Sequence, residues 1–147
     1  MKDEEERMKD EGRRMKAGKA TGVVDLRVRT TNFALRVIQM FASFPKTTEA
    51  QVLGKQVLRS GTSVGANYRE AYRARSKQEF IAKVGDCLKE ADESAYWLEL
   101  LVEAGVVPAQ QMVLLRDECD QLIAIFTAIA KKTKATLGQE RTGKDEI

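Results

Sequence analysis

The fold is decided by residues 76–105, which read SKQEFIAKVGDCLKEADESAYWLELLVEAG. Ser76 and Glu79 stand three positions apart at its start, which is the spacing of a capping box. Gly105 ends it, and glycine is the residue that most often follows a helix. Between them, apolar residues recur in nearly heptad steps: Phe80, Val84, Cys87, Leu88, Ala91, Ala95, Leu98, Leu101 and Val102. This pattern predicts an amphipathic helix over about 77–104 that packs against other helices.

Three more helices are predicted around this one. The first spans about 25–44, where apolar residues recur every three or four positions until Pro45 stops the pattern. The second spans about 48–73 and begins with capping-box spacing at Thr48-Glu49-Ala50-Gln51. The last spans about 108–136, with Pro108 in its first turn. Their apolar faces consist of Leu26, Phe33, Val37, Ile38, Phe41 and Phe44 in the first, Leu53, Val57, Val64 and Ala71 in the second, and Met112, Leu115, Cys119, Leu122, Ile123, Phe126, Ile129 and Ala130 in the last.

The middle of the second helix is rich in small residues. Residues 60–65 read SGTSVG, and most of these residue types are poor helix formers. Two alternatives follow from this composition. The small side chains permit either the close approach of a neighbouring backbone or a local kink.

Length and composition indicate one all-α domain. The chain has 147 residues, of which 32% are charged and 6% aromatic, with two prolines. Because four helices joined by short links run up and down beside their neighbours, we predict an antiparallel up-and-down four-helix bundle over residues 25–137. Residues 1–24 have almost no apolar periodicity and are expected to form a charged, mobile N-terminal arm. By the same argument, residues 138–147 are expected to form a polar tail.

The residue types present argue against an enzyme. The chain contains no histidine, which excludes Ser-His-Asp and Cys-His catalysis, HExxH and mixed Cys/His zinc sites, and the Glu-x-x-His pairs of di-iron bundles. Asn67, Glu90 and Glu93 lie on or beside apolar faces, without a nucleophile nearby in sequence. We expect these groups to be structural, with Arg59 or Asn67 as partners of the carboxylates. No catalytic residue, metal or cofactor is therefore predicted.

The sequence favours a cytoplasmic protein. No apolar run approaches the roughly 18 residues of a membrane span, and Met1 is followed by charged residues instead of an apolar signal core. No membrane contact is predicted. Cys87 and Cys119 would then lie in a reducing compartment, and neither belongs to a CxxC pair. Their expected offset along antiparallel helices is about 9 Å, so buried free thiols are predicted instead of a disulfide.

Basic residues are concentrated in the second helix. Lys55, Arg59, Arg69 and Arg73 fall within an arc of about 80° on the side opposite its apolar face. We call these four residues the basic stripe. Residues 51–77 contain six bases and one acid, a local charge of +5. Residues 79–120 contain three bases and ten acids, a local charge of −7, so the bundle should be electrically two-sided.

The basic stripe suggests contact with a phosphate backbone. The predicted nucleic-acid-binding residues are Lys55, Arg59, Arg69, Arg73, Arg75 and Lys77. Two alternatives stay open, namely ion pairing with an acidic helix of a neighbouring subunit and simple solvation. Arg59 has an alternative partner in Glu90 or Glu93. Lys131, Lys132 and Lys134 could extend a basic surface, but near the end of the last helix we favour an interaction with the helix dipole.

Three segments resemble a known family. They are QVLRSGTSVGANYREA at residues 56–71, Phe80-Ile81, and LKEADESAYWL at residues 88–98. Over about residues 25–136 the chain is similar to the bacterial four-helix bundle family named for the 23S rRNA intervening-sequence protein. Arg59, Ser60, Asn67, Glu70, Glu90 and Glu93 match the family pattern, which assigns no catalytic role to any of them.

The resemblance implies a small cytosolic bundle, often a homo-pentamer. A related bundle, the accessory variability protein of diversity-generating retroelements, is a basic pentameric barrel that partners a reverse transcriptase and nucleic acid. We therefore expect a non-enzymatic oligomer that binds RNA or DNA, with a reverse transcriptase as a candidate partner. The alternative is an adaptor for proteins that has no nucleic-acid role.

Two structural expectations complete the sequence argument. Leu58 and Tyr72 flank the basic stripe and are expected to be exposed on a lone bundle, together with Trp97. Since a soluble monomer rarely leaves such residues uncovered, we predict a ring-like homo-oligomer, most simply a pentamer. In the core, Leu88, Leu98 and Phe126 are expected to be buried.

Overall fold

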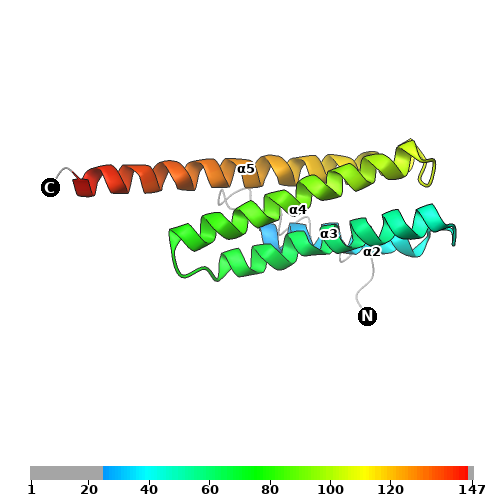
Figure 1. The fold of residues 1–147 in the computed structure, drawn as a ribbon, viewed down its shortest axis with the longest axis horizontal. Helices are drawn as coiled ribbons and strands as arrows, with labels where there is room; N and C mark the ends of the chain where they lie inside the picture. Colours follow the sequence, from blue (N-terminus) through cyan, green and yellow to red (C-terminus); the bar gives the residue numbers. More distant parts are fainter. Residues whose placement is uncertain (1–24, 146–147) are drawn as a thin grey trace, which may run out of the picture.

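The computed structural model describes residues 25–145, so the predicted N-terminal arm at residues 1–24 lies outside the described part of the chain. Four helices follow one another: α2 spans Leu26–Ala42, α3 spans Thr48–Tyr72, α4 spans Lys77–Glu103 and α5 spans Ala109–Asp145. They form an all-α bundle (Figure 1), which confirms the predicted fold class.

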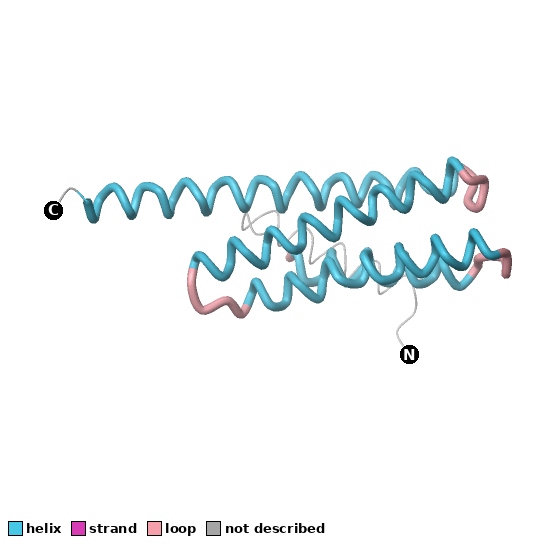
Figure 2. Tube along the Cα trace, in the orientation of Figure 1, coloured by secondary structure: helices cyan, strands magenta, loops and turns pink. Residues whose placement is uncertain are grey.

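The helices run up and down, so that each is antiparallel to the next (Figure 2). The α3–α4 turn lies at one end of the bundle, and the links that follow α2 and α4 lie at the other. α3 packs against α2 and α4, and α5 packs against α4 and more lightly against α2. α2 has 17 residues, whereas α5 has 37. The C-terminal part of α5 therefore projects past the bundle at the end that carries the α3–α4 turn.

Every helix contributes to the core. Fully buried large side chains are Phe33, Val37, Val57, Val64, Leu98, Leu101, Met112, Leu122 and Phe126. Burial of Leu98 and Phe126 confirms two of the three core predictions, but Leu88 is only half-buried at the edge of the core. The reason is helical register. Cys87 and Ala91 already point into the core, and Leu88 follows Cys87 by about 100° around α4.

Side-chain caps begin the central helices. At α4 the prediction is confirmed, because Ser76 Oγ accepts a hydrogen bond from the Glu79 N–H at 3.0 Å. At α3 the prediction is wrong by one residue. The cap is Thr47 and not Thr48, since Thr47 Oγ1 accepts from the Ala50 N–H at 3.4 Å. Each cap satisfies one of the N–H groups that have no partner within the helix.

Small residues bring α3 close to α2. α3 is one unbroken helix, so close approach describes residues 60–65 better than a kink. A Cβ atom at Gly61 would lie 3.1 Å from Val37 Cγ2, and a Cβ atom at Gly65 would lie 3.0 Å from Thr30 Oγ1. Glycine at these two positions therefore lets the neighbouring helices approach without steric overlap.

The C-terminal end of α5 differs from the prediction. The last helix was expected to end near residue 136 and to be followed by a polar tail at residues 138–147, but α5 continues to Asp145. The two glycines in this stretch disfavour helix by about 1 kcal/mol each, yet an existing helix extends by one hydrogen bond per residue. An ion pair between Lys77 Nζ and Glu140 Oε1 also ties this stretch to α4.

Both cysteines are buried free thiols, as predicted. Burial raises the pKa of Cys87 and of Cys119 to about 12. Cys119 also donates a hydrogen bond from Sγ to the carbonyl oxygen of Ala91 at 3.3 Å. The two thiols therefore belong to the core, where the reactive thiolate form is disfavoured.

Candidate nucleic-acid interface

The six predicted nucleic-acid-binding residues are all exposed, but they do not form one continuous surface. Lys55, Arg59 and Arg69 lie within α3, Arg73 caps its C-terminal end, Arg75 lies in the α3–α4 turn, and Lys77 begins α4. Helix α3, the turn and the start of α4 thus carry these cations at separate positions along the bundle. Their availability to a phosphate depends on their partners.

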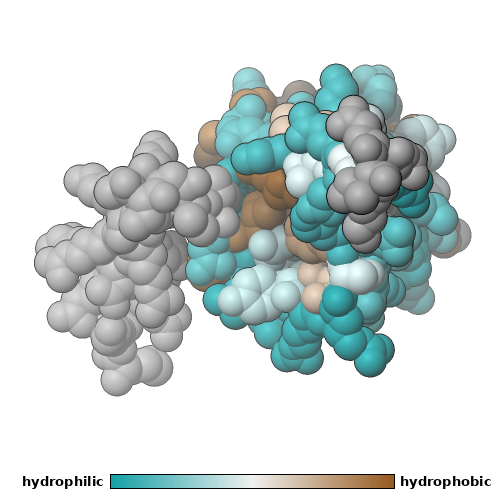
Figure 3. All heavy atoms as spheres, turned by 90° about the vertical axis from the view of Figure 1, so that its left-hand side faces the viewer, coloured by the Kyte–Doolittle hydropathy of each residue, from teal (hydrophilic) through white to brown (hydrophobic). Residues whose placement is uncertain are grey.

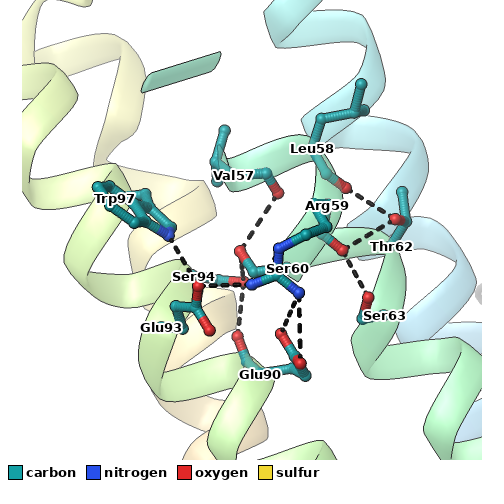
Figure 4. Close-up of polar contacts among 10 residues, drawn as sticks. All are labelled: Val57, Leu58, Arg59, Ser60, Thr62, Ser63, Glu90, Glu93, Ser94 and Trp97. Carbon is teal, nitrogen blue, oxygen red and sulfur yellow. Dashed lines mark hydrogen bonds and ion pairs between the residues drawn. The ribbon is translucent and has the colours of Figure 1, made fainter. Parts of the chain in front are cut away.

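Arg59 is bound to α4. Its Nη1 lies 3.3 Å from Glu90 Oε2, and its Nη2 forms an ion pair and hydrogen bond with Glu93 Oε1 (Figure 4). The hydrogen bond to Glu93 is the main reason that the pKa of Arg59 is raised and that of Glu93 is lowered. Trp97 Nε1 also donates to Glu93 Oε1, at 3.4 Å. The alternative role predicted for Arg59, as the partner of these carboxylates, is confirmed.

A buried hydroxyl pair lies beneath Arg59. Ser94 Oγ donates to Ser60 Oγ at 2.8 Å, and both side chains are fully buried between α3 and α4 (Figure 4). Sequence reasoning did not identify this contact. A signal was nevertheless present, because Ser60 and Ser94 each occupy a position on the apolar face of their helix. Buried polar groups of this kind must find a hydrogen-bond partner.

Three more cations are paired across helices, and one of them, Lys83 of α4, pairs with Glu70 Oε2 of α3. Lys77 Nζ pairs with Glu140 Oε1, so one of the six predicted nucleic-acid-binding residues already has an acidic partner. Arg29 Nη2 pairs with Glu118 Oε1 and lies 3.0 Å from Gln121 Oε1, a contact between α2 and α5 that the sequence did not suggest. Each of these pairs joins side chains of two different helices. Their first effect is therefore structural.

Four of the six predicted residues have no acidic partner within residues 25–143. These are Lys55, Arg69, Arg73 and Arg75. Lys55 lies 14 positions before Arg69, or about 21 Å along the helix. Because Arg59 is paired, the basic stripe leaves Lys55 alone at one end and a group of three arginines at the other. The three arginines are the available part of the predicted site.

The lysines of α5 have a different setting from the one predicted. Lys131, Lys132 and Lys134 are exposed, but α5 continues for about three turns beyond Lys134. Since the helix dipole acts within the last turn, the dipole interpretation is wrong. These lysines are therefore surface charges within a helix, and they also lack an acidic partner among residues 25–145.

The opposite charge is collected on α4 and the first half of α5. Residues 90–120 contain eight acids and one base, Arg116. Asp92, Glu99 and Asp120 line a shallow groove between these two helices, together with Arg116 and Tyr96. Within the described residues, no group of three Asp, Glu, Cys or His side chains could hold a metal ion. Nor does any described helix combine the length and apolar character that a membrane span needs.

A sequence model of the family described as "23S rRNA-intervening sequence protein" matches residues 25–128. The chain belongs to this family. A similar solved structure is that of a protein of unknown function from the S23 ribosomal protein family of Bacteroides thetaiotaomicron. It shares 35% sequence identity with this chain, has a TM-score of 0.67, and the match covers 71% of this chain and 97% of that one. No curated protein matches.

In this member of the family, several residues that carried the resemblance meet at one place. Arg59 and Ser60 of α3 contact Glu90, Glu93 and Ser94 of α4 (Figure 4). This cluster joins the two central helices of the bundle. The residues by which the sequence resembles the family are therefore, in large part, residues that hold α3 and α4 together.

Proposed function

We propose that this protein is a non-enzymatic oligomer that binds the RNA or DNA backbone. The observation that carries the proposal is a group of exposed arginines at the end of α3, Arg69, Arg73 and Arg75, which have no acidic partner within residues 25–143. Guanidinium groups hydrogen-bond phosphate oxygens in a bidentate way, and each neutralised phosphate releases counterions. Lys55 adds a separate contact further along α3.

Assembly would strengthen this binding. Leu35, Ile38, Val52, Tyr72, Tyr96, Val113 and Leu114 are large apolar or aromatic residues exposed on the single bundle. Leu58, expected to be exposed, is half-buried, and so is Trp97. The exposed residues support a homo-oligomer, for which we keep five subunits as the expected number. Several copies of the arginine group acting on one strand would then bind more tightly than one copy.

A reverse transcriptase is the protein partner we propose, by analogy with the accessory variability proteins. The analogy concerns architecture, and shared architecture does not fix function. The partner is therefore a separate proposal from nucleic-acid binding. Co-purification of a reverse transcriptase encoded beside the gene would support it.

The test is a charge-matched pair of triple variants. Wild-type protein should bind labelled RNA or DNA with a micromolar or smaller Kd at about 50 mM salt, and the affinity should fall steeply by about 200 mM. Arg69→Gln/Arg73→Gln/Arg75→Gln should lose at least tenfold in affinity. The control, Lys46→Gln/Lys89→Gln/Arg116→Gln, removes the same charge at three exposed positions away from the arginine group and should bind like wild type. Equal binding by all three proteins, or none by the wild type, contradicts the proposal.

The adaptor remains the second candidate, and the observation that favours it is the acidic surface of residues 90–120. That surface is complementary to the arginine group, so one subunit's arginines would pair with the acidic groove of its neighbour. If the protein is an adaptor, the arginine variant should have a different subunit number from the wild type. Nucleic-acid binding should then be undetectable in the wild type, the arginine variant and the control. Measuring mass and binding on the same samples separates the two candidates.

A further inference from the structure

The projecting part of α5 lies at the same end of the bundle as the arginine group. The α3–α4 turn and the C-terminal end of α5 occupy the same end of the molecule (Figure 1). The ion pair between Lys77 and Glu140 joins the two parts of the chain at this end, because Lys77 follows Arg75 by two positions and Glu140 lies in the projecting segment. Two basic segments that are far apart in sequence therefore lie at one end of the bundle.

The charge at this end is strongly positive and largely unpaired. Residues 127–143 contain four bases, which are Lys131, Lys132, Lys134 and Arg141, and one acid, Glu140. All four bases are exposed, and none forms an ion pair with an acidic side chain of residues 25–143. The acids near the turn are engaged, since Glu70 pairs with Lys83 and Glu79 Oε2 accepts from the Arg75 N–H at 3.3 Å.

An aromatic side chain lies next to the arginine group, because Tyr72 directly precedes Arg73. Tyr72, the last residue of α3, is 59% exposed. The guanidinium carbon of Arg27 lies 4.3 Å from the centroid of the Tyr72 ring, so one face of this ring is in contact with Arg27. Viewed from this end, the described surface is mainly hydrophilic, with apolar side chains showing between hydrophilic ones (Figure 3). Exposed aromatic rings among cations are typical of surfaces that stack the bases of single strands.

We infer that this end of the bundle is a binding site for single-stranded nucleic acid. Its phosphates lie between the arginine group and the lysines of α5, and one base stacks on Tyr72. The inference rests on the proposed function but goes beyond it, because it adds α5 to the interface and selects single strands over duplexes. A duplex hides its base faces in the stack, so Tyr72 would gain nothing from it.

The first experiment tests the contribution of α5. Lys131→Gln/Lys132→Gln/Lys134→Gln should weaken binding to a labelled single-stranded RNA about tenfold at about 50 mM salt. It should also reduce the slope of log K against log salt by about 2, since each phosphate contact on a single strand contributes about 0.7. The control is again Lys46→Gln/Lys89→Gln/Arg116→Gln, and circular dichroism checks that the helical content is kept.

The outcomes of this experiment distinguish the two proposals. If the α5 variant binds like wild type while the arginine variant is weakened, the further inference is overturned and the proposed function stands. If no protein binds, both fail. If both variants are weakened and the control is not, the interface includes both segments.

The second experiment tests base stacking. Tyr72→Ala should weaken binding to the single strand about tenfold, whereas Tyr72→Phe, which keeps the ring over Arg27, should bind like wild type. Binding to a duplex of the same sequence should be weaker for the wild type and equal for all three proteins. Equal affinity of wild type and Tyr72→Ala for the single strand, or a preference for the duplex, overturns the assignment of single strands.

Discussion

Arg59 carries one charge of the basic stripe, yet its guanidinium is bound to two carboxylates of α4. The Glu90 side chain is only 16% exposed, so without Arg59 a partly buried carboxylate would lose its partner. Removing one member of such a pair costs more than the pair itself contributes. Replacement of Arg59 should therefore act on the stability of the α3–α4 contact first.

We expect Arg59→Gln to flatten the acid dependence of stability. Arg59 lowers the pKa of Glu93 in the folded state, mainly through their hydrogen bond. A carboxyl with a lowered folded pKa stabilises the protein above its unfolded pKa, and this contribution is lost as the pH falls through the folded value. The Tm should thus fall less in Arg59→Gln than in wild type between about pH 7 and about pH 3. Because Arg59 is half exposed, the difference in stability at neutral pH should be about 1 kcal/mol or less.

The control for this measurement is Arg116→Gln, which removes an exposed arginine without touching Glu93. Its Tm should follow the wild-type dependence on pH. An identical acid dependence in Arg59→Gln and wild type would mean that the ion pair contributes nothing to folding.

At this scale the sequence predicted the ion pairs of Arg59, but not the burial of Leu88 or the hydroxyl contact of Ser94. Glu90 and Glu93 were identified as partners of Arg59 because a carboxylate beside an apolar face needs a cation. Leu88 was placed in the core because leucine is apolar, but a difference of about 100° around α4 leaves it at the edge. Ser94 was missed because its hydroxyl partner, Ser60, is 34 positions away.

Among the helices, α5 shows why an end is harder to predict than a beginning. Capping residues mark a start locally, as Ser76 does for α4. Near the end of α5 the contact with α4 is instead an ion pair between Glu140 and Lys77, which are 63 positions apart. Glycine and polar residues after residue 137 therefore indicated a tail, although the chain is helical there as far as Asp145.

Replacing two helical glycines with alanine should change the stability of the protein in opposite directions. A Cβ atom at Gly54 would overlap the ring of Phe41 and lie 3.0 Å from Phe44 Cδ2, so Gly54→Ala should lower the free energy of unfolding by about 1–3 kcal/mol. A Cβ atom at Gly85 in α4 meets nothing within 4 Å. Gly85→Ala should therefore raise the free energy of unfolding by about 0.5–1 kcal/mol, because alanine loses less backbone entropy on folding.

Urea denaturation of both variants and the wild type checks the sign of each change. If Gly54→Ala were as stabilising as Gly85→Ala, the close packing of α2 on α3 would not limit the side chain at this position. Opposite signs would show that the effect of a glycine-to-alanine substitution on the free energy of unfolding is determined by the neighbouring helix and not by helix propensity.

In the whole molecule, charge is separated along the bundle as well as around it. The arginine group and the lysines of α5 share one end, whereas residues 90–120 carry eight acids and one base. The sequence predicted the difference between α3 and α4, because each helix has its own charge pattern. It did not predict the basic end, since that depends on where the extended α5 lies relative to the α3–α4 turn.

The last prediction concerns assembly and follows from the same separation of charge. Light scattering should give a mass of about five times the 16.5 kDa of one chain. If apolar residues such as Leu114, which is 73% exposed, hold the subunits together, the mass should be unchanged at about 1 M salt. Dissociation in high salt would instead indicate that the arginine group pairs with the acidic surface of a neighbour. The arginines would then be occupied in the assembly, and the adaptor would become the better proposal.

A single mass of 16.5 kDa at micromolar concentration contradicts assembly in either form.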